Sequence, residues 1–204
     1  MLIGMCGLKG SGKNTVANII QKNYPNWETM SFASALKDGV AAFFGMDRKM
    51  LEGDTPEFRE IREQPNEFWC KKTGRADLTP RKILQEFGTD IIRKQFLDSF
   101  WVDRLELDLM NKKDKNIIIT DVRFPNEIEM IRNMGGQIWV VHCGELPKWF
   151  TDYRDKGIVP GKEIHESEWK WARVKPEVTI HPAVRGLELL EKMVLEKCKA
   201  QHIK

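Results

Sequence analysis

Short apolar runs recur along the chain, separated by longer stretches whose apolar residues are spaced as on one face of a helix. Runs of four or five apolar residues, ended by a turn-forming residue, are typical of buried strands. They predict strands at residues 2–6, 29–33, 116–120, 137–141 and 177–180. Because helical stretches lie between these runs, we expect an α/β fold with a parallel sheet covered by helices on both faces.

The helical stretches have recognisable ends. Thr79 and Pro80 begin one helix with suitable N-cap and first-turn residues, and this helix continues towards Trp101. Pro125 begins another, which closes at a pair of glycines. Further helices are expected over residues 14–21, 35–44, 101–110 and 184–197.

Two long segments lack a clear strand or core-helix pattern. Residues 45–78 are polar, charged and irregular, and we interpret them as a mobile helical insertion. Residues 143–173 are charged and aromatic, as in a lid over a binding site. A chain of 204 residues is long enough for one well-buried domain, so we expect a single domain over residues 1–204 that carries both segments.

The first predicted strand leads into the sequence GLKGSGKNT. Gly7, Gly12 and Lys13 have the spacing of a phosphate-binding loop, in which backbone N–H groups surround an anion at the start of a helix. The usual pattern has a hydroxyl residue directly after the lysine, whereas here Asn14 takes that place and Thr15 follows. A glycine-rich turn with a surface lysine is the alternative, but a strand before and a helix after favour the phosphate loop.

Asp121 follows the β-branched run of residues 116–120. A carboxylate at the carboxyl end of a buried strand lies where open α/β sheets bind their ligands, and it can order Mg²⁺ and its waters. Many strands also end in aspartate for turn reasons. Arg123 and Glu127 come next, either as site residues or as ordinary charges at a helix terminus.

Gln85, Thr89 and Arg93 are spaced four residues apart, so one face of an α-helix would carry all three. An amide, a hydroxyl and a guanidinium can bind base edges and a phosphate, although a solvated surface is the alternative that spacing alone favours. A separate apolar stripe is expected from Ile83, Phe87 and Ile91.

Composition narrows the class of protein. The net charge of +3, from 33 basic and 30 acidic residues, is too balanced to indicate polynucleotide binding. No apolar stretch approaches the ~20 residues of a membrane span. The four cysteines are scattered, which favours free thiols in a reducing compartment. We therefore expect a globular cytoplasmic protein.

The lid-like segment contains His165, Glu166 and Glu168. These residue types occur in metal sites, but no second histidine or cysteine stands nearby. A helix start with an acidic first turn is therefore the favoured interpretation.

Five segments in order, GLKGSGKNT, SFA-x-x-LK, TPRKILQEFGTDIIRKQF-x(4)-W, DVRFPNE and HESE, resemble the phage-type deoxynucleoside monophosphate kinase family. The matches run from residue 4 to about residue 168, and the LQEFGTD and DVRFPNE segments are more specific than the glycine loop. The resemblance implies a P-loop kinase fold, in which a phosphoryl group moves from ATP to a deoxynucleotide with Mg²⁺.

Carried over position by position, the resemblance also implies roles for individual residues. Lys13, Asp121 and Arg123 would be catalytic, with Asp121 holding Mg²⁺ through water. The ATP phosphates would lie on Lys9, Gly10, Ser11, Gly12, Lys13, Asn14 and Thr15. The acceptor would contact Lys37, Arg75, Gln85, Thr89, Arg93, Trp101, Asp121 and Glu127. The chain departs from the family where Asn14 replaces an acidic residue, and where the lid lacks a dense arginine cluster.

The expected reaction is ATP + dNMP → ADP + dNDP. The attacking phosphate is largely ionised at neutral pH, since its second pKa is ~6, so no general base is needed. The expected partners are small nucleotides. The expected location is the cytoplasm, which is the host's cytoplasm if a phage encodes the protein. The sequence allows a homodimer as well as a monomer. A P-loop kinase of another metabolite and a non-catalytic nucleotide-binding module are the alternatives.

Overall fold

The computed structural model describes residues 1–112, 114–182 and 186–203, which divide into two compact units. Unit 1 comprises Met1–Ser31 and Leu109–Lys204, and unit 2 is Phe32–Asp108. The predicted insertion of residues 45–78 lies inside unit 2, which extends beyond it at both ends.

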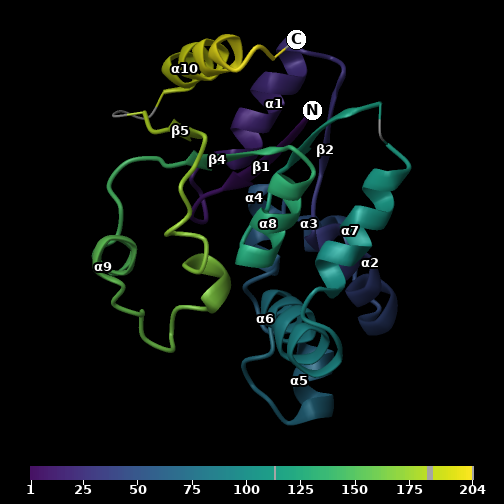
Figure 1. Ribbon diagram of the computed structural model, residues 1–204. Helices are drawn as coiled ribbons and strands as arrows, with labels where there is room; N and C mark the ends of the chain where they lie inside the picture. The colour runs from purple at the N-terminus through teal and green to yellow at the C-terminus, as the bar shows by residue number, and fades with distance from the viewer. Residues whose placement is uncertain (113, 183–185, 204) are drawn as a thin grey trace. The chain divides into compact units, whose positions relative to one another are not determined.

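Unit 1 is built on a parallel five-stranded sheet with the strand order β2-β3-β1-β4-β5 (Figure 1). The strands are β1 (Leu2–Cys6), β2 (Trp27–Met30), β3 (Asn116–Ile119), β4 (Gln137–Val141) and β5 (Val178–Ile180). The predicted parallel sheet is confirmed. The predicted bounds of the second strand are wrong: β2 begins two residues earlier than expected and ends before Ser31.

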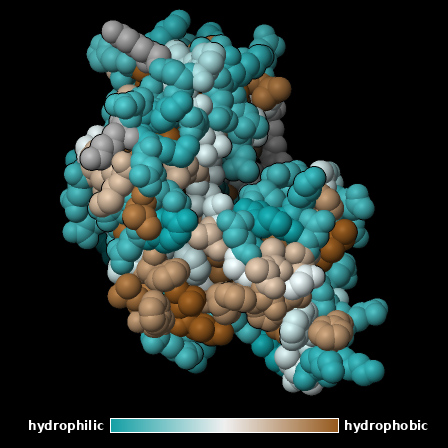
Figure 2. All heavy atoms as spheres, turned by 90° about the vertical axis from the view of Figure 1, so that its right-hand side faces the viewer, coloured by the Kyte–Doolittle hydropathy of each residue, from teal (hydrophilic) through white to brown (hydrophobic). Residues whose placement is uncertain are grey.

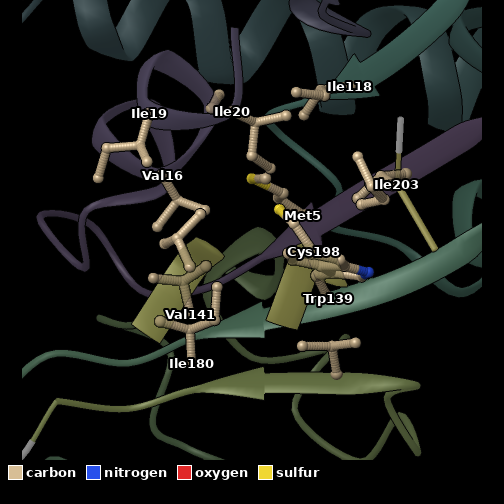
Figure 3. Packing of buried hydrophobic residues seen from close by; sticks show 14 of the residues in the cluster. Met5, Val16, Ile19, Ile20, Ile118, Trp139, Val141, Ile180, Cys198 and Ile203 are labelled. Carbon is tan, nitrogen blue, oxygen red and sulfur yellow. The ribbon is translucent and has the colours of Figure 1, made fainter. Parts of the chain in front are cut away.

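Helices α1 (Lys13–Asn23) and α10 (Leu187–Ala200) pack against each other and, with the sheet, enclose the core of unit 1. Figure 3 shows labelled side chains from β1, α1, β3, β4 and β5 converging with Cys198 of α10. Side chains alternate along a strand, so Ile3 and Met5 of β1 face this core together. The predicted start of the last helix at Val184 lies outside the described residues.

The opposite face of β1 carries helix α8 (Pro125–Asn133). A Cβ atom on Gly4 would lie 2.5 Å from Cδ1 of Ile131, so α8 approaches the sheet as closely as it does only because residue 4 has no side chain. This close packing fixes the segment between β3 and α8, which contains Asp121 and Arg123. The lid-like segment of unit 1 contains α9 (Lys148–Lys156) and a 3₁₀ turn, η2 (Glu166–Glu168).

Unit 2 is helical. Its helices are α2 (Ala33–Phe44), α3 (Arg48–Glu52), α4 (Pro56–Ile61), α5 (Glu67–Thr73), α6 (Pro80–Gln85), the π-helix η1 (Glu86–Phe96) and the beginning of α7 (Phe100–Met110). Residues 45–78, predicted to be helical, form three short helices whose N-caps, Asp47, Thr55 and Asn66, each accept a backbone N–H. Thr79 caps α6 in the same way, as predicted.

The core of unit 2 consists of Val40, Met46, Met50, Leu51, Leu78, Ile83 and Leu84. Figure 2 shows hydrophobic residues, in brown, gathered on one face at the height where Figure 1 shows α6. Large apolar side chains in this unit that remain exposed include Phe43, Phe68 and Phe96.

All four cysteines lie among the described residues and are free, as predicted. Burial raises the pKa of Cys6 to about 12 and that of Cys198 to about 11, so both thiols stay protonated at neutral pH. Within the described residues, the helices are too short or too polar to cross a membrane.

Candidate functional site

The loop between β1 and α1, residues 7–13, is called the anion loop below. Gly10 and Gly12 have φ angles of 77° and 94°, a region that favours glycine. A Cβ atom on Gly7 would lie 2.4 Å from the hydroxyl of Ser11 and 2.5 Å from the carbonyl oxygen of Val141. The loop therefore folds back tightly at the carboxyl end of the sheet, and α1 begins directly behind it.

The Ser11 hydroxyl inside this loop is buried and has no hydrogen-bond partner among the described residues. A buried hydroxyl without a partner is unfavourable by roughly 1–3 kcal/mol. An anion that accepts a hydrogen bond from this hydroxyl would remove the cost. The anion loop is therefore suited to the phosphates of a nucleotide.

Lys13 is only 9% exposed, and its Nζ donates to the carbonyl oxygens of Gly7 at 2.7 Å and Leu8 at 3.1 Å. Burial and the positive charge of Arg123 lower the pKa of Lys13 to about 7. The carboxylates of Glu168 and Asp121 act in the opposite direction but do not compensate. The site is therefore short of negative charge, which favours binding of an anion.

Arg123 joins this cluster from the segment after β3. Its Nη1 lies 3.3 Å from Oε2 of Glu168 and donates to the carbonyl oxygen of Gly7 at 3.4 Å. Arg123 and Lys13, both predicted as catalytic, thus meet at the first residue of the anion loop. They were predicted from separate motifs, and unit 1 brings them together.

Glu168 was missed as part of this cluster, because it was interpreted as the acidic first turn of a helix. The helix start itself is confirmed in the form of the 3₁₀ turn η2, where the Nδ1 of His165 accepts from the backbone N–H of Ser167 at 3.3 Å. The HESE segment was the signal available in the sequence, but nothing in it indicated which cation Glu168 would approach.

Asp121 follows β3, and its Oδ2 accepts a hydrogen bond from the Ser31 hydroxyl at 2.8 Å. Ser31 follows β2, the neighbouring strand, and was not predicted as a site residue. The backbone N–H of Val122 donates to the carbonyl oxygen of Met5 at 3.2 Å, which holds this segment against β1. A carboxylate and a hydroxyl offer the oxygen ligands that Mg²⁺ prefers, so these residues fit the ion.

Glu127 is 2% exposed, and its Oε2 accepts from the backbone N–H groups of Arg123 at 2.6 Å and Phe124 at 3.0 Å. This is the geometry of a carboxylate that caps the first turn of a helix. Glu127 therefore fixes the backbone of Arg123. Its predicted contact with the acceptor stays a prediction.

In unit 2, two predicted acceptor residues have carboxylate partners. The Nζ of Lys37 lies 2.5 Å from Oε1 of Glu52, and Arg75 forms a bidentate pair with Glu86 at 2.6 and 2.7 Å. Both cations are thus paired within unit 2. An acceptor phosphate that binds them would replace or share these carboxylates.

The stretch predicted as one continuous α-helix is α6 followed by the π-helix η1. Thr89 and Arg93 are buried, at 7% and 6% exposed, so the solvated-surface interpretation is wrong for both. Gln85 is half-buried. Ile91 is 44% exposed, so the predicted apolar stripe is wrong at this position. The cause is the wider π turn, which rotates residues away from their α-helical faces.

Trp101 is 7% exposed, and its indole N–H donates to the carbonyl oxygen of Gly88 in the π-helix at 2.9 Å. This hydrogen bond fixes the indole ring against the backbone of the π-helix in unit 2. Its predicted contact with the acceptor stays a prediction.

A sequence model of the family described as deoxynucleotide monophosphate kinase matches residues 42–158, more than half of the chain. The chain belongs to this family. It is 33% identical to a protein of Acanthamoeba polyphaga mimivirus whose name assigns it to the deoxynucleotide monophosphate kinases, over 68% of this chain and 72% of the relative. It is 28% identical to the deoxynucleoside-5'-monophosphate kinase of Escherichia phage T5, over 81% of this chain and 88% of the relative.

Membership of the deoxynucleotide monophosphate kinase family confirms the predicted enzyme class, a nucleoside-phosphate kinase. Two solved structures share the fold. A shikimate kinase from Aquifex aeolicus vf5 has a TM-score of 0.50 at 15% identity, covering 100% of this chain and 99% of the other. A Thermus thermophilus protein has a TM-score of 0.51 at 17% identity, covering 100% and 98%. The predicted P-loop kinase fold is confirmed.

Proposed function

We propose that this protein transfers the γ-phosphoryl group of ATP to a deoxynucleoside monophosphate and releases ADP and a deoxynucleoside diphosphate. Membership of the deoxynucleotide monophosphate kinase family carries this proposal. The anion loop lies outside the matched residues 42–158, so its geometry is independent support for a phosphate-binding enzyme.

The donor phosphates are proposed to bind the anion loop and the first turn of α1. Burial and the charge of Arg123 lower the pKa of Lys13, and the Ser11 hydroxyl has no hydrogen-bond partner in the described part of the chain, so both would gain from a bound anion. The remaining residues of this proposed site are Lys9, Gly10, Gly12, Asn14 and Thr15. Lys9, Asn14 and Thr15 are exposed and accessible to a ligand.

Asp121, held by Ser31, would bind Mg²⁺ through water. When bound, the ion neutralises phosphate charge. Arg123 would stabilise charge on the transferred phosphoryl group, and Glu127 keeps the backbone of Arg123 in place. No side chain has to remove a proton, because the acceptor phosphate is already ionised above its second pKa of ~6.

The acceptor is proposed to bind unit 2, with Thr89 and Arg93 as its central contacts. Arg93 suits a phosphate because a guanidinium offers several donors in a fixed plane. Lys37, Arg75 and Gln85 would complete the acceptor site, and the first two would exchange their carboxylate partners for it. The proposed substrates are small nucleotides, and a cytoplasmic location of the enzyme is part of the proposal.

A coupled assay of ADP release, run separately with each deoxynucleoside and ribonucleoside monophosphate, tests the proposal. We expect turnover with at least one deoxynucleotide, and its loss in Lys13→Met. Tight ATP binding without transfer to any monophosphate would instead support a non-catalytic binding module. Transfer to an alcohol acceptor, with a pH–rate profile that shows a base near neutral pH, would support a different metabolite kinase.

A further inference from the structure

The π-helix η1 of unit 2 has eleven residues, Glu86–Phe96. Its hydrogen bonds span five residues, and the backbone N–H of Leu97 continues the spacing by donating to Ile92 at 2.9 Å. Most π-helical segments in proteins are single turns, because the α-helix is the more favourable backbone. A π-helix of this length therefore needs contacts from outside itself.

Gly88 receives two such contacts. The indole N–H of Trp101 donates to its carbonyl oxygen at 2.9 Å, and this hydrogen bond is buried. A Cβ atom on Gly88 would lie 2.6 Å from Cδ2 of Leu36, so helix α2 packs directly on the π-helix backbone. One contact satisfies a carbonyl group, and in the other the missing side chain of residue 88 leaves room for the end of Leu36.

The helix type decides where Thr89 and Arg93 lie. In an α-helix, each residue turns by about 100°, so Thr89 and Arg93 would point about 140° and 180° away from Leu84. In the structure, Leu84, Thr89 and Arg93 are all buried. Their separations of five and four residues fit the wider π turn. Loss of the π register would therefore move Thr89 and Arg93 off the buried face.

We propose that Trp101 is a positioning residue for the acceptor nucleotide. Its indole N–H holds Gly88 in the π register and thereby keeps Thr89 and Arg93 in place. This inference rests on the proposed function, in that it takes Thr89 and Arg93 as acceptor contacts. It assigns Trp101 a role through the backbone of the π-helix in place of a direct contact with the nucleotide.

Trp101→Phe tests the role, because it keeps an aromatic ring and removes the N–H donor. The matched control is Trp69→Phe, which removes an equivalent bond in the same unit, from the indole to the carbonyl oxygen of Phe44 at 3.0 Å. We expect Trp101→Phe to raise the KM for the deoxynucleotide about tenfold and to leave the Kd for ADP within about twofold. Trp69→Phe should leave both constants unchanged, while the two variants lose similar melting temperature.

Gly88→Ala provides a second variant. It disturbs the π-helix but leaves the Trp101 side chain unchanged, so a direct contact between the indole and the nucleotide would not explain its effect. It should raise the same KM and leave ADP binding unchanged, because its methyl group meets the end of the Leu36 side chain and Leu36 and the π-helix have to shift relative to each other. An unchanged acceptor KM in folded Trp101→Phe would overturn the inference. An equal KM change in Trp69→Phe would overturn it as well.

Arg93→Ala separates this inference from the proposed function. If Arg93→Ala leaves the acceptor KM unchanged, the proposed acceptor site fails. If Arg93→Ala raises this KM and Trp101→Phe does not, only the positioning role fails. In the Arg93→Ala background, Trp101→Phe should raise the acceptor KM less than it does in the parent protein, because part of its effect acts through Arg93 and only the part that acts through Thr89 is left. Additive effects would show a direct contact of Trp101 and overturn the inference.

Discussion

The anion loop of unit 1 and the π-helix of unit 2 are built in opposite ways. In the loop, Lys13 bonds to Gly7 and Leu8, and the backbone N–H of Ser11 bonds to Leu8, so most contacts lie within six residues. The π-helix is supported by Leu36 and Trp101, which come from separate helices. A local site of the first kind can be recognised from a short motif, whereas the second kind depends on how distant helices pack.

The two regions also differ in how their polar groups are satisfied. Within residues 1–112, 114–182 and 186–203, the Ser11 hydroxyl of the loop has no hydrogen-bond partner, and burial together with the charge of Arg123 lowers the pKa of Lys13 to about 7. In unit 2, Lys37 and Arg75 already have carboxylate partners. The loop should therefore bind an anion with little rearrangement, while an acceptor at unit 2 has to compete with protein carboxylates. Four predictions test this difference.

The largest effect is expected from Lys13→Met. Loss of a cation that stabilises transferred charge should lower kcat/KM about 100- to 1,000-fold. Removal of a poorly compensated buried cation should also raise the free energy of unfolding by about 1–2 kcal/mol. Steady-state kinetics and urea denaturation measure the two effects. Lys9→Met, at an exposed position, is the control and should change stability little. Unchanged turnover in Lys13→Met would remove the loop from the reaction.

Gly7→Ala and Gly88→Ala compare the two regions directly. The added methyl at residue 7 meets the backbone oxygen of Val141, which cannot move easily, whereas at residue 88 it meets the end of the Leu36 side chain. We expect Gly7→Ala to lower the free energy of unfolding by about 2–3 kcal/mol, and Gly88→Ala by about 1 kcal/mol. Chemical denaturation provides both values. A larger loss in Gly88→Ala would reverse the comparison.

Acid sensitivity should be confined to unit 1, because all four histidines of the chain lie in its sequence. Burial, with the nearby positive charges of His181 and Arg154, lowers the pKa of His142 to about 4. Below pH 6.5 the unfolded state binds a proton at His142 that the folded state excludes. The free energy of unfolding therefore falls as the pH is lowered from 6.5 to about 4. The expected loss between pH 7.5 and 5.5 is about 1 kcal/mol.

Hydrogen exchange at pH 7.5 and at pH 5.5 should show that amide protection falls more in unit 1 than in unit 2 when the pH is lowered. His142→Leu should reduce the loss, and His202→Asn, at an exposed histidine, should leave it as in the parent protein. An equal loss of protection in unit 2 would contradict the assignment.

The smallest effect is expected from Glu168→Gln. Its carboxylate lies beside Arg123 and partly neutralises the positive charge around Lys13, so it should compete with bound phosphates. Removing the charge should tighten ADP binding about three- to fivefold, as measured by calorimetry. Glu166→Gln is the control on the same turn, since Glu166 pairs with Lys170 at 2.7 Å. Weaker ADP binding in Glu168→Gln would show that Glu168 instead orients Arg123 for the nucleotide.

The parts of the fold that were predictable share a local origin. The anion loop, β1 and β4 follow from a contiguous motif and from apolar runs, and their predicted positions agree with the structure. The position of Asp121 after a buried strand was predicted correctly from the apolar run before it, while its role stays a prediction. The start of β2 was predicted two residues too late. β2 is an edge strand whose burial alternates weakly, so its apolar pattern gives a poor indication of where it begins.

Other features depend on partners that no local pattern identifies. Ser31 and Asp121 are 90 residues apart, and Arg123 and Glu168 are 45 apart, so only the folded unit 1 reveals these pairs. The apolar spacing of Ile83, Phe87 and Ile91 fits an α-helix well. The π register is supported by Leu36 and Trp101 through tertiary contacts, which a periodicity argument does not include.

The strand order has a consequence for how the protein folds as it is synthesised. In β1, Leu2 pairs with Ile117 and Gly4 pairs with both Ile119 and Ile138, so the first strand leaves the ribosome long before its neighbours exist. Unit 2, by contrast, is continuous in sequence and is complete at residue 108. Its helices can therefore form on the ribosome while β1 still waits for β3 and β4, and the central sheet is the last part of the nascent chain to assemble.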